Sequence, residues 1–217
     1  KEFKIKNLIN KYFKLSCVIS QPAKKAKRGH NILKSPVQNF AEQNKLIIKT
    51  PTRIEDEYNY LKEVNIDLAI VVAYGQIIPS KILKLSKNGF INIHASLLPK
   101  WRGDSPVQHA LMNNDKITGY TFIIMNERLD EGKIIYKEKI NIDLADNYTT
   151  LLSKIISLAS KVLVSKIEDL SNNSIKPQAQ IHSEASYCYK IKKDDTYLKF
   201  NTSAEEVLGK VKAFSPN

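Results

Sequence analysis

The chain has 217 residues, of which 42% are hydrophobic and 26% are charged, and these proportions are typical of a globular protein with one large domain. They exclude a disordered chain, a collagen-like repeat and a membrane channel. The net charge of +12 favours a polyanionic partner, nucleic acid or an anionic membrane, although a Lys-, Ile- and Asn-rich genome composition would give the same charge.

Helical periodicity and apolar runs alternate along the first half of the chain. Helical spacing predicts helices at residues 3–12, 37–44 and 55–64. Apolar runs predict strands at residues 15–19, 46–49, 66–73 and 90–95, with a long loop at 20–36. Because these strands are apolar throughout, the predicted fold class is α/β: an open, mostly parallel twisted sheet with helices on both faces.

The alternation continues in the second half of the chain. A helix is predicted at residues 107–112, followed by strands at 120–125 and 133–142 on either side of a polar turn. Residues 147–170 have the periodicity of a long amphipathic helix. Residues 187–200 are predicted to be irregular, and Ser203 is a predicted N-cap of a last helix.

The cysteines and histidines do not indicate a metal site. Cys17 and Cys188 are far apart, and none of the four histidines has a neighbour at ligand spacing. Two buried thiols in a reducing cytosol are the simplest interpretation, so a cytoplasmic location is predicted. The most apolar stretch, residues 66–78, contains Asp67 and Gln76, so no membrane association is expected.

The predicted strand at residues 90–95 carries two polar side chains. Asn92 and His94 are two residues apart, so both point to the same face of the strand. A hydrogen-bonded Asn–His pair in the core is one interpretation, and a binding or catalytic site at the end of the strand is the other. The long turn at residues 96–103 follows directly, as expected of a loop that lines a site.

The turn Asp130-Glu131-Gly132 is a second candidate. Asp and Gly are ordinary turn residues, so this sequence needs no function unless Asp130 reaches His94.

These segments together resemble the folate-dependent formyltransferases. That family has an Asn, a His two residues later, a Ser-Leu-Leu-Pro turn and a distant Leu-Asp-x-Gly turn, which match Asn92, His94, residues 96–99 and residues 129–132. The Trp-Arg-Gly at 101–103 and Pro-Val-Gln at 106–108 resemble the family members that formylate methionyl-tRNA. The sequence differs from the family pattern at Asp104, at Lys133 and within the loop at residues 20–36.

The resemblance implies the transfer of a formyl group from 10-formyltetrahydrofolate to the α-amino group of initiator methionyl-tRNA. The expected catalytic residues are Asn92, His94 and Asp130. The first two would stabilise the tetrahedral oxyanion, and Asp130 would hold His94, favour its charged form and take part in proton transfer. The amine of the substrate is itself the nucleophile, and no metal is implied.

The family also implies two sets of binding residues. Those expected to contact folate are Val72, Tyr74, Gly75, Gln76, Ile77, Ile78, Ser96, Leu97, Leu98 and Pro99. Those expected to contact tRNA are the cations of a basic loop, Lys24, Lys25, Lys27 and Arg28. A solvated charge run would be the interpretation of this loop in a protein without the resemblance.

The expected organisation is a catalytic domain at residues 1–186, followed by a linker and helix at 187–217. From the resemblance, a strand is expected before residue 1, and a C-terminal β-barrel domain is expected after residue 217. A monomer is expected. The alternative function is that of a formyltransferase acting on a small amine, such as a sugar nucleotide or a purine precursor.

Overall fold

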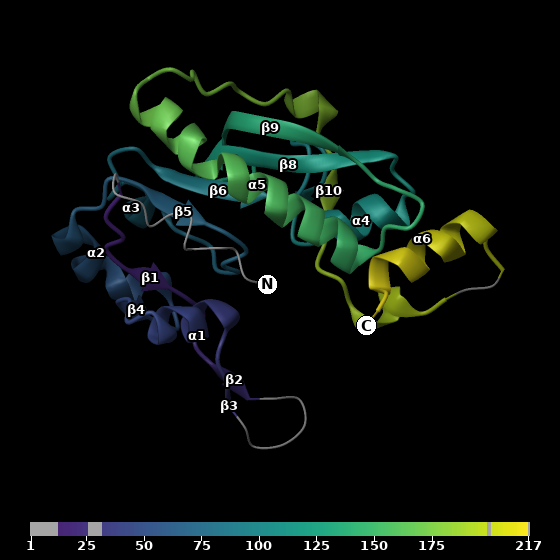
Figure 1. Cartoon of the computed structure of the whole chain (residues 1–217), viewed down its shortest axis with the longest axis horizontal. Coiled ribbons are helices and arrows are strands. Elements are labelled where there is room, and N and C mark those ends of the chain that lie inside the picture. The colour runs from purple at the N-terminus through teal and green to yellow at the C-terminus, as the bar shows by residue number, and fades with distance from the viewer. Residues whose placement is uncertain (1–12, 26–31, 199–200, 217) are drawn as a thin grey trace. The chain divides into compact units, whose positions relative to one another are not determined.

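The computed structural model describes residues 13–25, 32–198 and 201–216 (Figure 1). It contains two compact units, Lys1–Phe90 and Ile91–Asn217. The predicted helix at residues 3–12 lies outside the described residues. The predicted division into residues 1–186 and 187–217 stays a prediction.

Short strands and helices alternate in the first unit. Its strands are β1 (Val18–Ile19), β2 (Lys24–Lys25), β3 (Ile32–Leu33), β4 (Ile48–Lys49) and β5 (Ala69–Val71). Its helices are α1 (Pro36–Gln43), η2 (Ile54–Glu57), α2 (Tyr58–Val64) and α3 (Ser80–Leu83). β1 and β4 are parallel, and β2 and β3 form an antiparallel pair inside the interval that was predicted to be a single loop.

Two local features explain why α1 and α2 form where the sequence predicts them. Ser35 caps α1 by accepting a hydrogen bond from the backbone N–H of Gln38, and Pro36 occupies the first turn, where no N–H is needed. α2 ends at Asn65, which adopts a left-handed conformation with φ of 51°.

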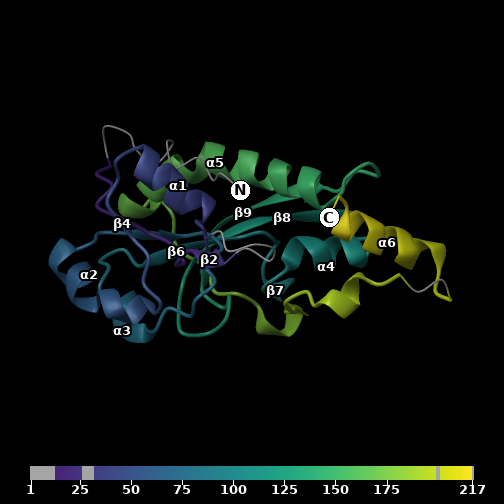
Figure 2. The same ribbon diagram turned by 90° about the horizontal axis from the view of Figure 1, so that it is seen from below.

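The second unit contains the longer elements. Its strands are β6 (Phe90–His94, of which Phe90 belongs to the first unit), β7 (Arg102–Gly103), β8 (Ile117–Ile124), β9 (Lys133–Asn141) and β10 (Tyr187–Cys188). Its helices are α4 (Pro106–Met112), α5 (Tyr148–Ser171), η3 (His182–Glu184), η4 (Lys193–Thr196) and α6 (Ala204–Phe214). Figure 2 shows α5 running along β8 and β9, and α4 beside α6.

The α/β class is confirmed, with parallel pairs β1–β4 and β7–β10. The run β6–β8–β9 is antiparallel. For β8 and β9 this follows from their short connection, because parallel neighbours need a crossover of about a dozen residues or more. The predicted irregular segment at 187–200 contains β10, whose register Tyr187↔Arg102 brings it beside β7.

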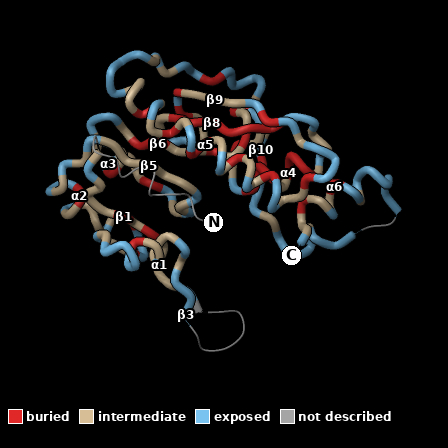
Figure 3. Tube along the Cα trace, viewed as in Figure 1, coloured by how far each residue is buried: buried red, intermediate tan, exposed pale blue. Residues whose placement is uncertain are grey.

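The core of the second unit lies between α5 and the antiparallel strands. Figure 3 shows buried residues along β8, and the side chains of Tyr120 and Phe122 are at most 1% exposed. From α5 the buried residues include Leu151, Ile155 and Leu163, at helical spacing. This packing supports β8, the strand with which β6, the carrier of Asn92 and His94, is paired.

The start of α5 is fixed by a buried carboxylate. Asp146 is 3% exposed and accepts hydrogen bonds from Lys154 Nζ (2.7 Å), Thr150 Oγ1 (2.9 Å) and the backbone N–H of Asp143 (2.8 Å). Burial opposes ionisation of Asp146, but these hydrogen bonds outweigh it and lower the pKa of the carboxyl group below its ordinary value of 3.8.

We expect Asp146→Asn to lower the free energy of unfolding by roughly 1–3 kcal/mol at pH 7, because the charged hydrogen bonds are lost. A carboxyl group whose pKa is lower in the folded state stabilises the protein above its unfolded pKa. This contribution disappears as the pH falls through the folded pKa. The difference from wild type in urea unfolding should therefore shrink below about pH 4. Asp143→Asn, at a largely exposed carboxylate, is the control, and equal stability of Asp146→Asn and wild type at pH 7 would contradict this assignment.

Candidate active site

Strand β6 presents Asn92 and His94 on one face. Its register with β8 places Asn92 opposite Ile123 and His94 opposite Thr121. The Thr121 hydroxyl donates to the carbonyl oxygen of Ser96 (2.7 Å) and accepts from the backbone N–H of Leu98 (3.0 Å). The turn after His94 is thereby tied to the same strand that supports β6.

The structure brings Asn92, His94 and Asp130 together. Asn92 Nδ2 donates to Asp130 Oδ1 at 3.1 Å, and His94 Nδ1 lies 3.5 Å from Asp130 Oδ2. The Asp130 side chain is 10% exposed and that of His94 is 6% exposed, so the cluster is largely shielded from water. The Asp-Glu-Gly turn is therefore more than a plain connection between β8 and β9.

The second nitrogen of the His94 ring also faces an acceptor. Nε2 lies 2.7 Å from the carbonyl oxygen of Trp101. Only the imidazolium form carries a proton on both nitrogens, so only this form donates to Trp101 while facing the Asp130 carboxylate with an N–H. Both ring nitrogens of His94 therefore face an acceptor oxygen.

The position of Asp130 depends on a close approach between β7 and β10. The backbone N–H of Gly103 donates to Asp130 Oδ2 at 2.9 Å. Gly103 has φ of +119°, and a Cβ atom there would lie 2.0 Å from the carbonyl oxygen of Cys188. Glycine is required because no larger residue fits this backbone contact.

Two residues that sequence reasoning missed complete the surroundings of Asp130. Gln180 donates through Nε2 to the carbonyl oxygens of Asp130 and Gly132, both at 2.8 Å. Arg102, of which 1% is exposed, donates to Gln180 Oε1 and forms an ion pair with Glu131 at 3.2 Å. The polar interval at 172–186 gives no periodic signal that would have singled out Gln180.

The predicted folate-side turn in the first unit has a distorted backbone. Ala73 and Gly75 have φ of 46° and 75°, and Gln21 Nε2 donates to the carbonyl oxygen of Tyr74 at 2.9 Å. This turn ends β5 at Val71, two residues before the predicted end of the strand. Val72 lies between the strand and the turn and is partly exposed.

The next three residues of the predicted folate wall have different environments. Gln76 accepts from the backbone N–H of Ile54 (2.9 Å) and donates to the carbonyl oxygen of Pro51, so its side chain holds the turn. Ile77 is 90% exposed, whereas Ile78 is 6% exposed and belongs to the core. Ile77 is thus the more exposed of the two isoleucines that were expected to contact folate.

The Ser-Leu-Leu-Pro turn is mostly buried. Ser96 and Leu98 are fully buried, Pro99 is buried, and the Ser96 hydroxyl donates to the carbonyl oxygen of Lys100. Leu97 is partly exposed. Ser96 and Leu98 therefore shape the turn, and their expected contact with folate stays a prediction.

The basic loop is described in part. Lys24 is exposed on β2, which pairs with the exposed residues Ile32 and Leu33 of β3. Lys25 lies on the same strand. Lys27 and Arg28 lie outside the described residues.

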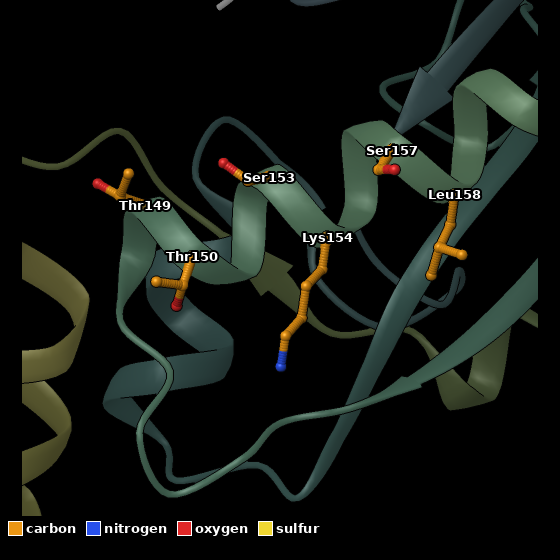
Figure 4. Close-up of a pocket in the computed structure, with 6 residues that line it drawn as sticks. All are labelled: Thr149, Thr150, Ser153, Lys154, Ser157 and Leu158. Carbon is orange, nitrogen blue, oxygen red and sulfur yellow. The ribbon is translucent and has the colours of Figure 1, made fainter.

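A groove of about 630 Å³ runs along the first half of α5 (Figure 4). It is lined by Thr149, Thr150, Ser153, Lys154, Ser157 and Leu158. Lys154 is paired with Asp143 and Asp146, and no predicted site residue lines the groove. The groove is therefore separate from the cluster around Asp130.

Neither a metal site nor a membrane span is found in the described part of the chain. Among the described residues, no three His, Cys, Asp or Glu side chains are grouped so that they could hold a metal ion. Within the same residues, every helix is too short or too polar to cross a membrane.

Solved structures with this fold include an N-formyltransferase and a sugar N-formyltransferase. The N-formyltransferase from Helicobacter canadensis, in complex with folinic acid and dTDP-3-aminofucose, matches with a TM-score of 0.74. The match has 21% identity and covers 97% of this chain and 75% of that one. The sugar 3N-formyl transferase WlaRD matches with a TM-score of 0.68 and 24% identity, over 91% of this chain and 68% of that one. At these identities the likeness shows a shared fold.

The sequence comparisons identify the family. Residues 5–167 match the model of the formyl transferase family. The methionyl-tRNA formyltransferase of Pelagibacter ubique (strain HTCC1062) is 41% identical over 98% of this chain and 70% of its own length. That of Prochlorococcus marinus (strain MIT 9312) is 40% identical over 92% of this chain, which spans 64% of the relative. The chain therefore belongs to the formyl transferase family, in the group of the methionyl-tRNA formyltransferases.

Proposed function

We propose that Asn92, His94 and Asp130 form the catalytic site for transfer of a formyl group from 10-formyltetrahydrofolate to the α-amino group of initiator methionyl-tRNA. The observation that carries this proposal is the convergence of an amide, an imidazole and a carboxylate from β6 and the distant turn at 129–132. These groups supply a hydrogen-bond donor for the oxyanion and an acceptor for the proton of the amine. Formyl transfer to an amine requires both.

In the reaction, the neutral amine attacks the formyl carbon, and a tetrahedral oxyanion forms. The amide nitrogen of Asn92 carries two N–H groups, one of which points to Asp130, and the other is the proposed donor to the oxyanion. As the bond between the formyl carbon and folate N10 breaks, the proton lost by the amine passes through Asp130, directly or through water, to N10. No enzyme nucleophile enters the sequence of steps.

His94 has a second proposed role at the oxyanion. Its Nε2 is directed at the carbonyl oxygen of Trp101, so donation to substrate requires an exchange of acceptor. An oxyanion accepts a hydrogen bond from imidazolium more strongly than a neutral carbonyl does, so the exchange becomes favourable as negative charge develops. Asp130 faces the other ring nitrogen, Nδ1, at 3.5 Å.

We expect Gly75→Val to weaken the binding of a folate analogue at least tenfold. The turn at Gly75 has φ of +75°, and a Cβ atom there would lie 3.1 Å from Gln21 Nε2, whose hydrogen bond to Tyr74 shapes the proposed folate wall. Calorimetric titration with folate analogue and with tRNA measures the two sites separately. Binding of tRNA should stay within about twofold, and unchanged folate affinity would remove residues 72–78 from the donor site.

The proposed acceptor is tested by comparing two amines. Radiolabelled formyl donor is supplied with methionyl-tRNA or with a dTDP-amino sugar, and the product of each is measured at equal acceptor concentration. The proposal predicts transfer to methionyl-tRNA at least a hundredfold faster than to the sugar nucleotide. Faster transfer to the sugar would support the alternative of a small-amine formyltransferase.

A further inference from the structure

We infer that Gln180 is a positioning residue for formyl transfer, which holds the turn at Asp130 in the conformation that aims its carboxylate at Asn92 and His94. The inference concerns the reaction proposed above and therefore rests on that function. Gln180 lies in an interval outside every motif of the sequence, and its side chain touches the backbone of the turn rather than the catalytic groups themselves.

The carboxamide of Gln180 makes four hydrogen bonds. Its Nε2 donates to the carbonyl oxygens of Asp130 and Gly132, which flank Glu131 on either side. Its Oε1 accepts from Nε and Nη2 of Arg102, at 3.2 Å and 2.8 Å. A carboxamide has two donor hydrogens and one oxygen with two lone pairs, so all four hydrogen-bonding positions of this side chain are filled.

Arg102 binds Glu131, the residue of the turn that lies between the two whose carbonyl groups Gln180 contacts. Its Nη1 lies 3.2 Å from Glu131 Oε1, while its guanidinium is held by Gln180. The residue after it, Gly103, donates its backbone N–H to Asp130 Oδ2. The backbone and the side chain of Asp130 are thus fixed from two distant segments of the chain, residues 102–103 and Gln180.

The turn needs this support because its backbone is not relaxed. Asp130 has φ of 51°, in the left-handed region that non-glycine residues rarely adopt and that persists only where the surroundings hold it. Gln180 is 6% exposed, so the two carbonyl groups would lose their donors in a place with little access to water. A displacement of a catalytic group by about 1 Å can cost about a hundredfold in rate.

The test uses Gln180→Glu, which has the same shape. The carboxylate still accepts from Arg102, but it offers no donor to the two carbonyl groups and repels them. Gln178→Glu is the matched control, because the exposed side chain of Gln178 lies two residues earlier on a segment fixed by backbone pairing with Ile134. We expect Gln180→Glu to lower kcat by about 10- to 100-fold with both KM values within about twofold, and Gln178→Glu to match wild type.

The effect of Gln180→Glu is also measured in an Asp130→Asn protein. This comparison shows whether Gln180 acts by positioning Asp130 or only stabilises the fold. If Gln180 acts through Asp130, Gln180→Glu lowers kcat no further once Asp130 has been replaced. A further tenfold loss in that background would overturn the inference, and so would wild-type kcat in a folded Gln180→Glu protein.

NMR measurements that need no catalytic activity test this inference separately from the proposed function. Ring ¹H–¹⁵N NMR signals of His94 should move in Gln180→Glu in the direction that they move in Asp130→Asn, and should stay in place in Gln178→Glu. In the unaltered chain, the Nε2 protons of Gln180 should exchange with solvent at least tenfold more slowly than those of Gln178, and equal rates would overturn the inference. A folded protein that transfers no formyl group would contradict the proposed function. The NMR signals would still test whether Gln180 holds the turn at Asp130.

Discussion

Replacing Asp130 with Asn should lower the kcat of formyl transfer by about 10²- to 10⁴-fold while the chain stays folded. The carboxylate accepts from Asn92 Nδ2 and from the N–H of Gly103, and it faces His94 at 3.5 Å. An amide at this position offers a single acceptor oxygen and turns an N–H group toward one of these donors. It also takes no proton from the attacking amine.

The fold should survive because the turn is held mainly through its backbone. Gln180 binds the carbonyl oxygens of residues 130 and 132, which the substitution leaves in place. Steady-state rates at saturating folate donor and methionyl-tRNA give kcat, and circular dichroism reports the fold. Asp104→Asn, at the exposed residue that follows Gly103, is the control and should stay within about twofold of wild type. A folded Asp130→Asn protein with wild-type kcat would contradict the assigned role.

Replacing Lys24, Lys25, Lys27 and Arg28 with Ala should flatten the salt dependence of tRNA binding. Each cation that neutralises a phosphate contributes about 0.7–0.9 to the slope of log K against log salt concentration, so the slope should change by about 3. Wild-type affinity should then fall between 50 and 200 mM salt by about 60-fold more than that of the variant. Filter binding at a series of salt concentrations measures both slopes.

A second variant with the same change in charge controls for the overall field of the protein. Ala replacements at four exposed lysines on other segments of the chain, Lys84, Lys139, Lys161 and Lys176, remove the same number of positive charges. The slope of this control should stay within about 1 of wild type. Equal slopes for the loop variant and wild type would place the tRNA surface elsewhere on the chain.

The elements with strong periodicity are those that the sequence predicts well. The long helix was predicted at residues 147–170 and spans Tyr148–Ser171, because its apolar side chains recur every three or four residues over six turns. The sequence also predicts that Asn92 and His94 share a face, because residues two apart in a strand point to the same side. Short elements such as β1 and β4, with two residues each, carry little periodic signal and were predicted too long.

Contacts across long stretches of the chain account for what the sequence does not predict. The pairing of β7 with β10 places Gly103 beside Cys188. This close contact depends on a glycine, and it leaves no apolar pattern in the sequence from which it could be predicted. Residues 187–200 are polar, so a strand there was missed. Gln180 is buried by its hydrogen bonds to one turn and one arginine, and a single Gln in a polar segment gives no sign of such contacts.

A double-mutant cycle between His94 and Asp130 tests most directly whether the cluster acts as one catalytic unit. The single-turnover rate is measured for wild type, His94→Ala, Asp130→Asn and the double variant, with the folate donor and methionyl-tRNA both saturating. Groups that act together lose most of the rate when one of them is removed. The double variant should therefore be within about threefold of the slower single variant. A loss equal to the product of the two single losses would contradict the account, because it would mean that His94 and Asp130 contribute independently.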